Sequence, residues 1–533
     1  MIDLKEKYKD LQPLPCGMQD FEKIRTNGLL YVDKTEYVHK LATDRNGYCY
    51  FLGRPRRFGK SLFLSSLACY FNARKDLFEG LKIMELEKAW KKYEVLRFDL
   101  SGCSSVAALK AMFSQKLRFL EEKYGITYNE QFAIRDRFAK VIHTAANNNM
   151  QRVVILIDEY DYPMQETINK AEEHEKMRTE YMSIFSVFKS ECYYIYKVFL
   201  TGILKFTQLS DCSALNNICV ISANDEYAGA YGFTQEELHI YFKRYIERLA
   251  DSLEITYEQA FQAILERYGS YSFSRNLTKV INPYTLLNCL LDCNLGNDWI
   301  NSGATEMLME GIDRGEHQMP NWDCEYLDIN TLELGDFNKN NFVLFLYQTG
   351  YMTIKDFCKD VDVYKLSVPN TEVKEAISKL VIPRLLEKKE YAVNSNISAF
   401  RRNFIHGDLE KAMQHLQYLV AGTPYSQDHT EKAIEERFQF ILVQVLYLCG
   451  FKPQEEVSVA TGRIDIVCKT KWRNAIFELK MTRNGGLNAA SEQISDRHYA
   501  APFLAEDKEL TTFAIEFDSS KKELTDWRIE KVK

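Results

Sequence analysis

A segment rich in glycine and arginine near residue 55 has the composition of a loop that binds phosphate. Its sequence is Gly53-Arg-Pro-Arg-Arg-Phe-Gly-Lys-Ser61. In such loops backbone N–H groups point at phosphate oxygens, the lysine reaches the β- and γ-phosphates, and the final hydroxyl holds magnesium. The apolar run 48–52 precedes the segment as a strand, and an amphipathic helix opens at Ser61. We predict that ATP contacts the residues Gly53, Arg56, Arg57, Phe58, Gly59, Lys60 and Ser61.

The loop differs from the general pattern at its first turn. Arg54 stands where the first glycine is expected, and Gly53 lies one residue earlier. Pro55 removes one N–H donor from the loop. Arg56 and Arg57 can replace the missing donor as phosphate ligands, or they can be solvated surface charges. The composition of the loop leaves both interpretations open.

A hydrophobic strand that ends in acids follows later in the chain. The run 153–157 leads into Asp158 and Glu159. At such a strand end, the first acid positions magnesium and the second activates the attacking water. A further strand, 198–201, ends in Thr201, whose hydroxyl we expect to sense the γ-phosphate. The alternative is that buried strands simply meet solvent at polar residues, but the order of the loop and the acids favours an ATPase.

A second group of charged residues lies near the C-terminus. It consists of Gly462-Arg-Ile-Asp465 and, after twelve intervening residues, Glu478-Leu-Lys480. Metal-dependent cleavage of a phosphodiester needs carboxylates that gather magnesium and a base or cation near the attacking water. Residues two apart on a strand share a face, so Glu478 and Lys480 point together, and Asp465 meets them from the partner strand. Glu436, on a preceding helix, is placed to add a third carboxylate.

We therefore predict that Asp465 and Glu478 bind magnesium and that Lys480 and Glu436 complete a catalytic group. The alternative is a hairpin with ordinary solvated charges. At the tip of this hairpin, Lys469-Thr-Lys-Trp-Arg473 combines three cations with an aromatic ring. This composition suits a contact with a nucleic-acid phosphate, although exposed turns of other proteins have it too.

The elements that must position these residues indicate an α/β protein. Residues 48–220 alternate apolar runs with helical patterns, which is typical of βαβ units around a parallel sheet. Helical patterns follow from Thr234, which we interpret as an N-cap. A polar stretch at 421–428 is the best candidate for a linker.

The C-terminal part is predicted as a helix, three strands, a helix and a strand. We expect the elements at 430–449, 456–459, 463–468, 475–480, 489–500 and 511–517. Three domains follow from these patterns. They are a P-loop NTPase domain at 1–233, a helical and mixed middle region at 234–425, and a C-terminal α/β domain at 426–533.

Composition restricts the class of protein further. The formal net charge of -7 argues against a protein that is coated for nonspecific binding to nucleic acid, so any such contact must be local. The 13 cysteines are scattered and suggest neither a disulfide framework nor a zinc site. No signal peptide or membrane span is evident. We expect a cytoplasmic protein that makes no contact with a membrane.

Several short motifs resemble one known family along almost the whole chain. They are Tyr31-Val-Asp-Lys-Thr35, Arg54-Pro-Arg-Arg-Phe-Gly-Lys-Ser61, Asp158-Glu-Tyr-Asp161, Thr201-Gly-Ile-Leu-Lys205, Leu215-Asn-Asn217, Asn282-Pro-Tyr284, Gln348-Thr-Gly-Tyr351 and Pro369-Asn-Thr-Glu-Val373. They look like the bacterial AAA-ATPase-like family, whose members join a predicted ATPase to a C-terminal PD-(D/E)XK nuclease-superfamily domain.

This resemblance implies a restriction-endonuclease-like fold for the C-terminal domain and a supporting role for Gln493 beside its catalytic group. It also implies that the arginine-rich loop is usual for the family. The segment Arg267-Tyr-Gly-Ser-Tyr271 departs from the family, whose members have an aspartate there. Any role of that aspartate is therefore absent from this chain.

The leading hypothesis is an ATP- and magnesium-dependent protein whose nuclease domain cuts nucleic acid, with DNA favoured over RNA. One alternative is an ATP-dependent switch whose C-terminal domain binds nucleic acid or a partner without cleaving. A second alternative is a nuclease whose P-loop binds nucleotide without hydrolysing it. The sequence leaves open whether the chain forms a homo-oligomer.

Overall fold

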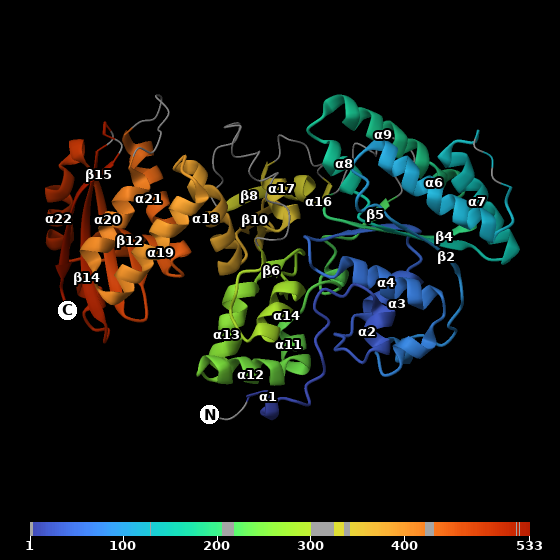
Figure 1. The fold of residues 1–533 in the computed structure, drawn as a ribbon, viewed down its shortest axis with the longest axis horizontal. Helices are drawn as coiled ribbons and strands as arrows, with labels where there is room; N and C mark the ends of the chain where they lie inside the picture. The colour runs from blue at the N-terminus through green and yellow to red at the C-terminus, as the bar shows by residue number, and fades with distance from the viewer. Residues whose placement is uncertain are drawn as a thin grey trace. The chain divides into compact units, whose positions relative to one another are not determined.

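The chain folds into two compact units, Met1–Thr371 and Glu372–Lys533. The computed structural model describes residues 4–533 except 128, 130, 205–217, 300–323, 335–341, 422–430, 519 and 522. Each unit has its own sheets and core (Figure 1). This division does not test the boundaries after residues 233 and 425, which stay predictions. The motifs at 205 and 215–217 and nearly all of the predicted linker lie outside the described residues.

The first unit is built on a five-stranded sheet, and its parallel arrangement agrees with the sequence prediction. Its strands are β1 (Cys49–Gly53), β2 (Glu94–Asp99), β3 (Val153–Asp158), β4 (Ile195–Gly202) and β5 (Ile218–Val220). Their order is β2-β3-β4-β1-β5, and every neighbouring pair is parallel. β4 therefore lies between the strand that precedes the phosphate loop and the strand that ends in Asp158. The carboxyl ends of these three strands meet at one edge.

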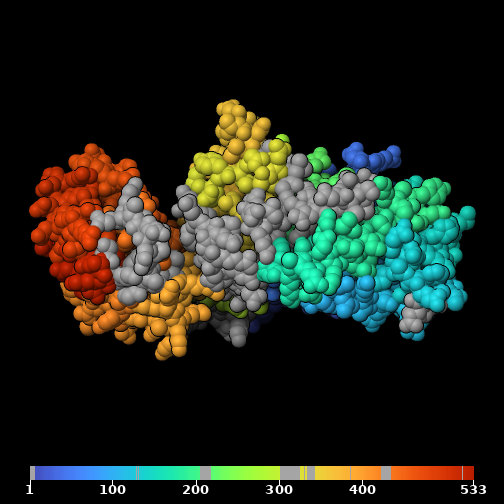
Figure 2. Space-filling view, turned by 90° about the horizontal axis from the view of Figure 1, so that it is seen from above, coloured from blue at the N-terminus to red at the C-terminus, as the bar shows by residue number. Residues whose placement is uncertain are grey.

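Helices cover both faces of this sheet, which explains the continuous apolar runs in its strands. Figure 1 shows α2 (Phe21–Thr26), α3 (Thr35–Thr43) and α4 (Lys60–Phe71) on one face. The other face carries α6 (Val106–Lys123), α7 (Ile134–Asn148), α8 (Tyr162–Thr167) and α9 (Ala171–Phe185). The cyan surface in Figure 2 belongs to α6 and α7, which form an outer face of this unit. Short helices at Leu4–Lys7 (α1), Ile83–Leu86 (α5) and Val187–Ser190 (α10) complete this part.

A group of four helices follows the sheet. They are α11 (Gln235–Tyr241), α12 (Lys243–Leu253), α13 (Tyr257–Tyr268) and α14 (Pro283–Asp292). Thr234 caps α11 as predicted, and a full capping box forms because Glu237 bonds back to the backbone of Thr234. A two-stranded ribbon, β6 (Tyr271–Ser272) and β7 (Lys279–Val280), lies between α13 and α14.

The last part of the first unit is a small antiparallel sheet with two helices. It contains β8 (Glu325–Asp328), α16 (Ile329–Leu334), α17 (Phe342–Thr349), β9 (Thr353–Cys358) and β10 (Val363–Ser367), with strand order β8-β10-β9. The helix ending before Gly350 and the strand after it agree with the sequence pattern.

The second unit has a mixed five-stranded sheet with helices on both faces. Its helices are α18 (Thr371–Leu385), α19 (Glu390–His406), α20 (Leu409–Val420), α21 (Glu431–Leu448) and α22 (Gly486–Asp496). Its strands are β11 (Lys452–Val459), β12 (Gly462–Lys469), β13 (Arg473–Met481), β14 (Glu509–Asp518) and β15 (Glu523–Lys531), in that spatial order. The β13–β14 pair is parallel and the other pairs are antiparallel. The predicted succession of helix, three strands, helix and strand is thus confirmed by α21 to β14.

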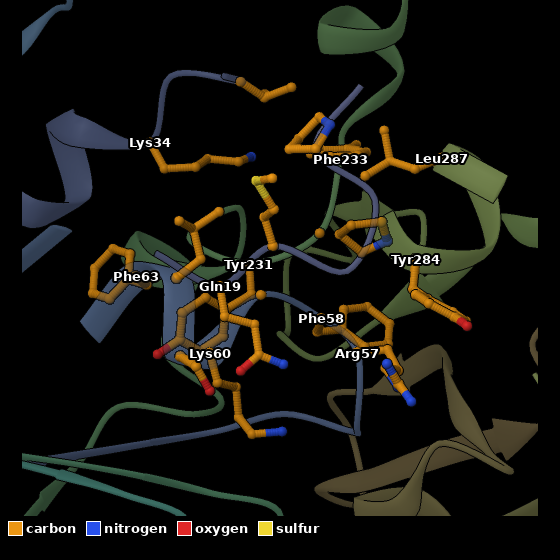
Figure 3. A pocket seen from close by; sticks show the side chains of 18 of the residues that line it. Gln19, Lys34, Arg57, Phe58, Lys60, Phe63, Tyr231, Phe233, Tyr284 and Leu287 are labelled. Atoms are coloured by element: carbon orange, nitrogen blue, oxygen red, sulfur yellow. The ribbon is translucent and has the colours of Figure 1, made fainter. Parts of the chain in front are cut away.

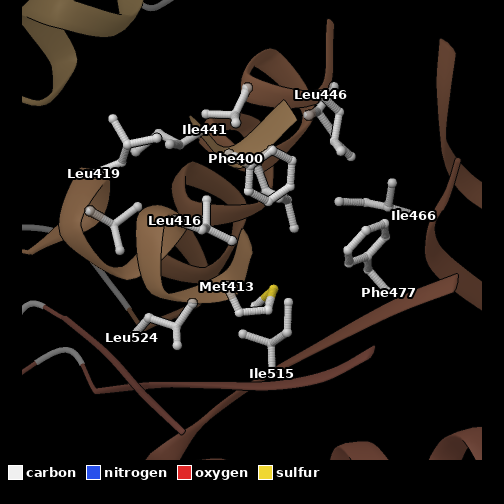
Figure 4. Packing of buried hydrophobic residues seen from close by; sticks show 14 of the residues in the cluster. Phe400, Met413, Leu416, Leu419, Ile441, Leu446, Ile466, Phe477, Ile515 and Leu524 are labelled. Atoms are coloured by element: carbon white, nitrogen blue, oxygen red, sulfur yellow. The ribbon is translucent and has the colours of Figure 1, made fainter. Parts of the chain in front are cut away.

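Apolar side chains cover both faces of this sheet. Figure 4 shows one face, where Phe400, Met413 and Ile441 from three helices pack toward Phe477 and Ile515. The other face packs Ile464, Val467 and Ile476 against Ala490 and Ile494 of α22. Strand β13 is consequently buried on both sides along its length. A charged side chain on β13 must therefore leave bulk water.

Candidate nucleotide and metal sites

The loop between β1 and α4 has two parts with different hydrogen-bond partners. The N–H of Gly53 donates to the Oγ of Ser222 at 2.9 Å, and the N–H of Arg54 donates to the carbonyl of Gly202 at 3.2 Å. These two donors hold the loop to the neighbouring strands. The start of α4 has N–H groups without intrahelical partners and follows Gly59, which has φ 95°. The N–H groups that suit the predicted contact with phosphate therefore lie in the second part of the loop, 56–61.

Lys60 lies at the centre of the loop and is folded over its backbone. Its Nζ donates to the carbonyls of Arg54 and Pro55, both at 3.0 Å, and the residue is 6% exposed. Burial lowers the pKa of this ammonium, while the nearby Asp161, Glu159 and Asp158 act in the opposite direction. These two carbonyls accept the hydrogen bonds that phosphate oxygens would accept from Lys60 in a complex with nucleotide.

The two arginines of the loop have different surroundings. Arg56 is half-buried, and its charge lies close enough to lower the pKa of Glu159. Arg57 is exposed, has φ 70° and lies with its guanidinium 4.4 Å from the ring centroid of Tyr284, beside which Figure 3 shows it. Tyr284 is held by Asn282, which caps α14 through the N–H of Tyr284. Whether either arginine binds phosphate stays a prediction.

Phe58 anchors the loop through its side chain. The ring is 1% exposed and packs edge-on against Tyr271 and Phe273, with centroid separations of 5.0 and 5.5 Å. The carbonyl of Phe58 accepts the N–H of Gly232. Phe58 and Gly53, two of the predicted nucleotide ligands, are thus placed to hold the shape of the loop.

Asp158 and Thr201 meet at the carboxyl ends of adjacent strands. The hydroxyl of Thr201 donates to Oδ1 of Asp158 at 2.7 Å, and both residues are buried. Glu159, one residue further, is half-buried and has φ 48°, a strained value for a residue with a side chain. Burial raises the pKa of Glu159, with contributions from Asp161 and Asp158, while Lys60 lowers it. A carboxylate whose pKa is raised in this way is a stronger base than an ordinary glutamate.

Asp161 is a residue whose role the sequence did not reveal. Its Oδ2 accepts the N–H groups of Ile203 at 2.9 Å and Leu204 at 2.6 Å. A Cβ on Gly202 would lie 2.3 Å from Asp161, so this glycine is required by the close approach. Asp161 fixes the backbone directly after Thr201. The one sequence feature that pointed to Asp161 was its place in the motif, two residues after Glu159.

A cavity of about 450 Å³ opens beside the loop. The loop, Glu159 and Lys34 line its polar side, and Met18, Phe233, Tyr284 and Leu287 line an apolar side. Figure 3 shows Lys60 and Arg57 at one end of this cavity and Lys34 at another. Lys34 is itself committed, because its Nζ donates to Glu237 at 2.6 Å and to the carbonyl of Gly229 at 2.8 Å. The cavity combines phosphate ligands with an apolar wall, as nucleotide sites do.

In the second unit, Asp465, Glu478 and Lys480 come together on neighbouring strands. Oδ2 of Asp465 accepts the N–H of Leu479 at 2.8 Å, one step beyond the last β12–β13 pair. The Nζ of Lys480 donates to Oε1 of Glu478 at 3.1 Å and to the carbonyl of Leu479 at 3.1 Å. The predicted geometry of this group is therefore present in the fold.

Burial affects the pKa of all three side chains. Burial and the charge of Asp465 raise the pKa of Glu478 to about 7, against the lowering effect of Lys480. Burial likewise raises the pKa of Asp465. For Lys480 burial lowers the pKa, but the charges of Glu478 and Asp465 outweigh it and raise the pKa. Such shifted groups are typical of catalytic sites.

The helix before the hairpin carries an acid that the sequence did not single out. Glu435 is half-buried, and its pKa is raised by burial and by Asp465 while Lys480 lowers it. Glu436, the neighbouring acid, is exposed, and its role stays a prediction. Gln493 donates to the hydroxyl of Tyr499 at 3.1 Å, and its supporting role also stays a prediction.

The residues fit a divalent cation in one respect. Among the described residues, the carboxylate atom Oε2 of Glu478 has no hydrogen-bond partner, and such a buried atom gains most from a cation. Carboxylate oxygens are the ligands that magnesium prefers. In the described ranges of the chain, no group of three or more His, Cys, Asp and Glu side chains is placed to hold a metal ion.

The cations at the tip of the hairpin are mostly engaged within the unit. Lys469 pairs with Glu506 at 2.6 Å, and Arg473, 3% exposed, pairs with Glu509 at 3.2 Å. Trp472 is 47% exposed. The tip can therefore offer an aromatic surface, but two of its three cations have other partners.

Two family models match the chain in the order that the sequence predicted. Residues 15–210 match the predicted AAA-ATPase family, and residues 433–527 match the PD-(D/E)XK nuclease superfamily. The chain thus carries an AAA-ATPase-like region followed by a nuclease-superfamily region. The resemblance and the fold class are confirmed.

Individual proteins add little to this result. The chain is 26% identical, over 97% of its length and 98% of the other chain, to an uncharacterized protein in the vnfD 5' region of Azotobacter chroococcum mcd 1. Cdc6p of Pyrobaculum aerophilum is 10% identical, with coverages of 66% and 93% and a TM-score of 0.24. ORC1 of Aeropyrum pernix, solved in complex with DNA, is 9% identical with the same coverages and TM-score. Scores of this size support no argument about this chain.

The cysteines and the apolar helices can also be compared with the sequence analysis. All cysteines in the described part are free. No helix of the described residues combines the length and the apolar character needed to cross a bilayer.

Proposed function

We propose that the first unit binds and hydrolyses ATP. The observation that carries this proposal is the hydrogen bond between Thr201 and Asp158 at the strand ends, beside a cavity that Lys60, Ser61 and Glu159 line. Lys60 would exchange the loop carbonyls for the β- and γ-phosphates. Thr201 would orient Asp158 and contact the transferred group.

Ser61 and Asp158 would hold Mg²⁺, which neutralises the charge that develops on the phosphates. Glu159 accepts a proton from the attacking water, a role for which its raised pKa is suited. Arg56 and Arg57 bring positive charge to the phosphate end. The apolar wall with Phe233, Tyr284 and Leu287 would take the base.

For the second unit we infer a metal-dependent nuclease activity on nucleic acid, with DNA favoured as substrate. Asp465 and Glu478 would hold Mg²⁺, which polarises the scissile phosphate and its attacking water. Glu435 adds a carboxylate from α21. Lys480, kept charged by its acidic neighbours, stabilises the negative charge that develops at the phosphate.

One observation favours the alternative, an ATP-dependent switch that binds nucleic acid without cleaving it. Lys480 already occupies Oε1 of Glu478 at 3.1 Å, and an internal ion pair competes with a metal for this carboxylate. In that case the second unit would bind without turnover.

An ATPase assay tests the first proposal. Lys60→Ala should abolish hydrolysis and weaken nucleotide binding, whereas Glu159→Gln should bind ATP and turn it over more slowly by about a hundredfold or more. Lys92→Ala, at an exposed lysine outside the cavity, should behave as the wild type. ATP turnover that survives in Glu159→Gln would refute the proposed base.

A cleavage assay with duplex DNA, single-stranded DNA and RNA decides between the nuclease and the switch. With Mg²⁺ or Mn²⁺, the wild type should cleave at least one substrate, and Asp465→Ala should not. The ATPase activity of Asp465→Ala should persist. Binding without cleavage in the wild type would establish the switch instead. Lys521→Ala, an exposed lysine of the same unit, is the matched control.

A further inference from the structure

Two arginines of the second unit lie near the start of β12, beside the acids of the proposed nuclease site. Arg463 is two residues before Asp465 on this strand, and its side chain is 66% exposed. Arg497 is exposed and directly follows the last residue of α22. Both guanidinium groups are therefore open to a large ligand that approaches from solvent.

Hydrogen bonds and close packing hold the two arginines near each other. The hydroxyl of the buried Tyr499 donates to the carbonyl of Arg463 at 2.6 Å and accepts Nη1 of Arg497 at 3.4 Å. A Cβ on Gly462 would lie 2.8 Å from the same Nη1, so the side chain of Arg497 lies against the backbone directly before Arg463. The hydroxyl of Thr461 donates to the carbonyl of Arg497. The fold thus brings both arginines to one end of β12.

This end of the strand is within electrostatic reach of the proposed metal ligands. Burial raises the pKa of Asp465, and the charges of Lys480 and Arg463 act against that rise. Two residues along a strand span about 7 Å. Successive phosphates of one DNA strand are about 3.4 Å apart along the helix axis. Arg463 is therefore placed for a phosphate one or two nucleotides away from a phosphate that lies at Asp465.

Glu456 is the acid that competes with such a phosphate. Its carboxylate pairs with Nε of Arg463, and its charge also raises the pKa of Asp465, although less than burial does. The side chain of Glu456 is 42% exposed, and an ion pair between exposed side chains contributes little to stability. The pair can therefore open at low cost when a phosphate replaces the carboxylate.

We propose that Arg463 and Arg497 bind the phosphate backbone of DNA beside the phosphate that the second unit cleaves, and that Glu456 limits this binding. The inference rests on the proposed nuclease function, because that function places the scissile phosphate at Asp465. Arginine suits the role, since its planar guanidinium forms two parallel hydrogen bonds with phosphate oxygens. Such contacts fix the position of the nucleic acid and carry no base specificity.

Fluorescence anisotropy with the full chain and a labelled duplex DNA tests the surface, without divalent cation so that no cleavage takes place. Arg463→Ala and Arg497→Ala should each weaken binding by about tenfold or more at low salt. Each variant should also reduce the slope of log Kd against log salt concentration by about 0.9. The losses should be equal on two duplexes of unrelated sequence, because the contacts are with the backbone.

Glu456→Gln separates a role in binding from a role in stability. The variant removes the competing charge and should lower Kd by about two- to fivefold, the equivalent of one exposed ion pair. If the pair only held the hairpin together, the same variant would melt at a lower temperature and bind DNA no better. Arg528→Ala, at an exposed arginine of β15, is the matched control and should bind as the wild type does.

The inference is overturned if both alanine variants keep the affinity and salt dependence of the wild type, or if Glu456→Gln binds no more tightly. Cleavage with Mg²⁺ is measured on the same samples. A wild type that cleaves DNA, together with alanine variants that bind as tightly, refutes this surface and leaves the proposed function standing. A wild type that binds DNA through both arginines without cleaving it refutes the nuclease and leaves the surface.

Discussion

At the scale of single residues, Glu478 shows how a buried strand sets the chemistry of its only acid. Burial and Asp465 raise its pKa to about 7, whereas metal binding requires the ionised form. Below about pH 7, protons compete with the metal. We expect the affinity of the second unit for Mn²⁺ to fall by about tenfold per pH unit as the pH drops from about 7 toward 6, and to level off above about 8.

Titration calorimetry with Mn²⁺ and no nucleotide measures this dependence. Glu478→Gln carries no ionisable group at this position and should bind weakly at every pH, with a much flatter profile. A wild-type profile that is flat between about pH 6 and 8 would contradict the role of Glu478 as a ligand, because its proton would then not compete.

In the first unit, the hydroxyl of Thr201 can be tested by its effect on stability and on ATP turnover. This buried hydroxyl donates to Oδ1 of Asp158, and Thr201→Val removes this donor at nearly equal volume, which leaves that oxygen the N–H of Glu159 at 3.2 Å. We expect a loss of about 1–3 kcal/mol in the free energy of unfolding and a fall in kcat of at least about tenfold. Thr201→Ser keeps the hydroxyl and should retain most of the turnover. Equal activity of the valine and serine variants would show that the hydroxyl has no part in catalysis.

At the scale of elements, the end of α17 supports the phosphate loop. Gly350 follows the helix with φ 90°, and a Cβ there would lie 2.9 Å from the Cβ of Pro55. Gly28 also follows a helix end, with φ 63°, but has open space around its missing Cβ. Gly28→Ala should cost about 1 kcal/mol for backbone strain alone. Gly350→Ala should cost more, because Pro55 must also move.

Urea denaturation compares the two alanine variants, and fluorescence titration with a labelled ADP compares their nucleotide affinities. The affinity should fall in Gly350→Ala and stay unchanged in Gly28→Ala. Equal stability losses and equal affinities would mean that the contact with Pro55 has no effect on the loop.

Elements whose periodicity and flanking residues agree were predictable from the sequence. Strands β1, β3 and β4 of the parallel sheet were expected because their apolar runs end at polar motifs, and β11 to β14 followed from a helix and a hairpin pattern. Strand β15 and helices α19 and α20 were not expected. Strand β15 alternates exposed charges with few apolar residues, and the two helices carry no chemical motif.

The sites were predictable in their residue types but not in their orientation. One step along α21 separates Glu435 from Glu436 and turns the side chain by about 100°. The sequence does not fix that rotation when both neighbours are acids. Similarly, the burial of Arg54 depends on Phe273 and Ser222, which lie far away in the chain. Only the fold brings them to the loop.

At the scale of the whole molecule, the two units have separate cores, and this separation should be measurable. The core of the second unit is formed by residues 382–524, whereas the described residues that line the cavity beside the phosphate loop lie between 15 and 287. A ligand that binds one native unit stabilises that unit by mass action. We expect two calorimetric transitions for the full chain. ADP should raise the midpoint of one, and Mn²⁺ without nucleotide should raise the midpoint of the other.

Variants assign the transitions without dividing the chain. Lys60→Ala should remove the shift caused by ADP and preserve the shift caused by Mn²⁺, and Asp465→Ala should do the reverse. At a ligand concentration of about 100 times Kd, each shift reflects about 2.7 kcal/mol of added stability. A single transition that moves with both ligands would mean that the units unfold as one cooperative body. In that case ADP would also stabilise the nuclease-like unit against unfolding.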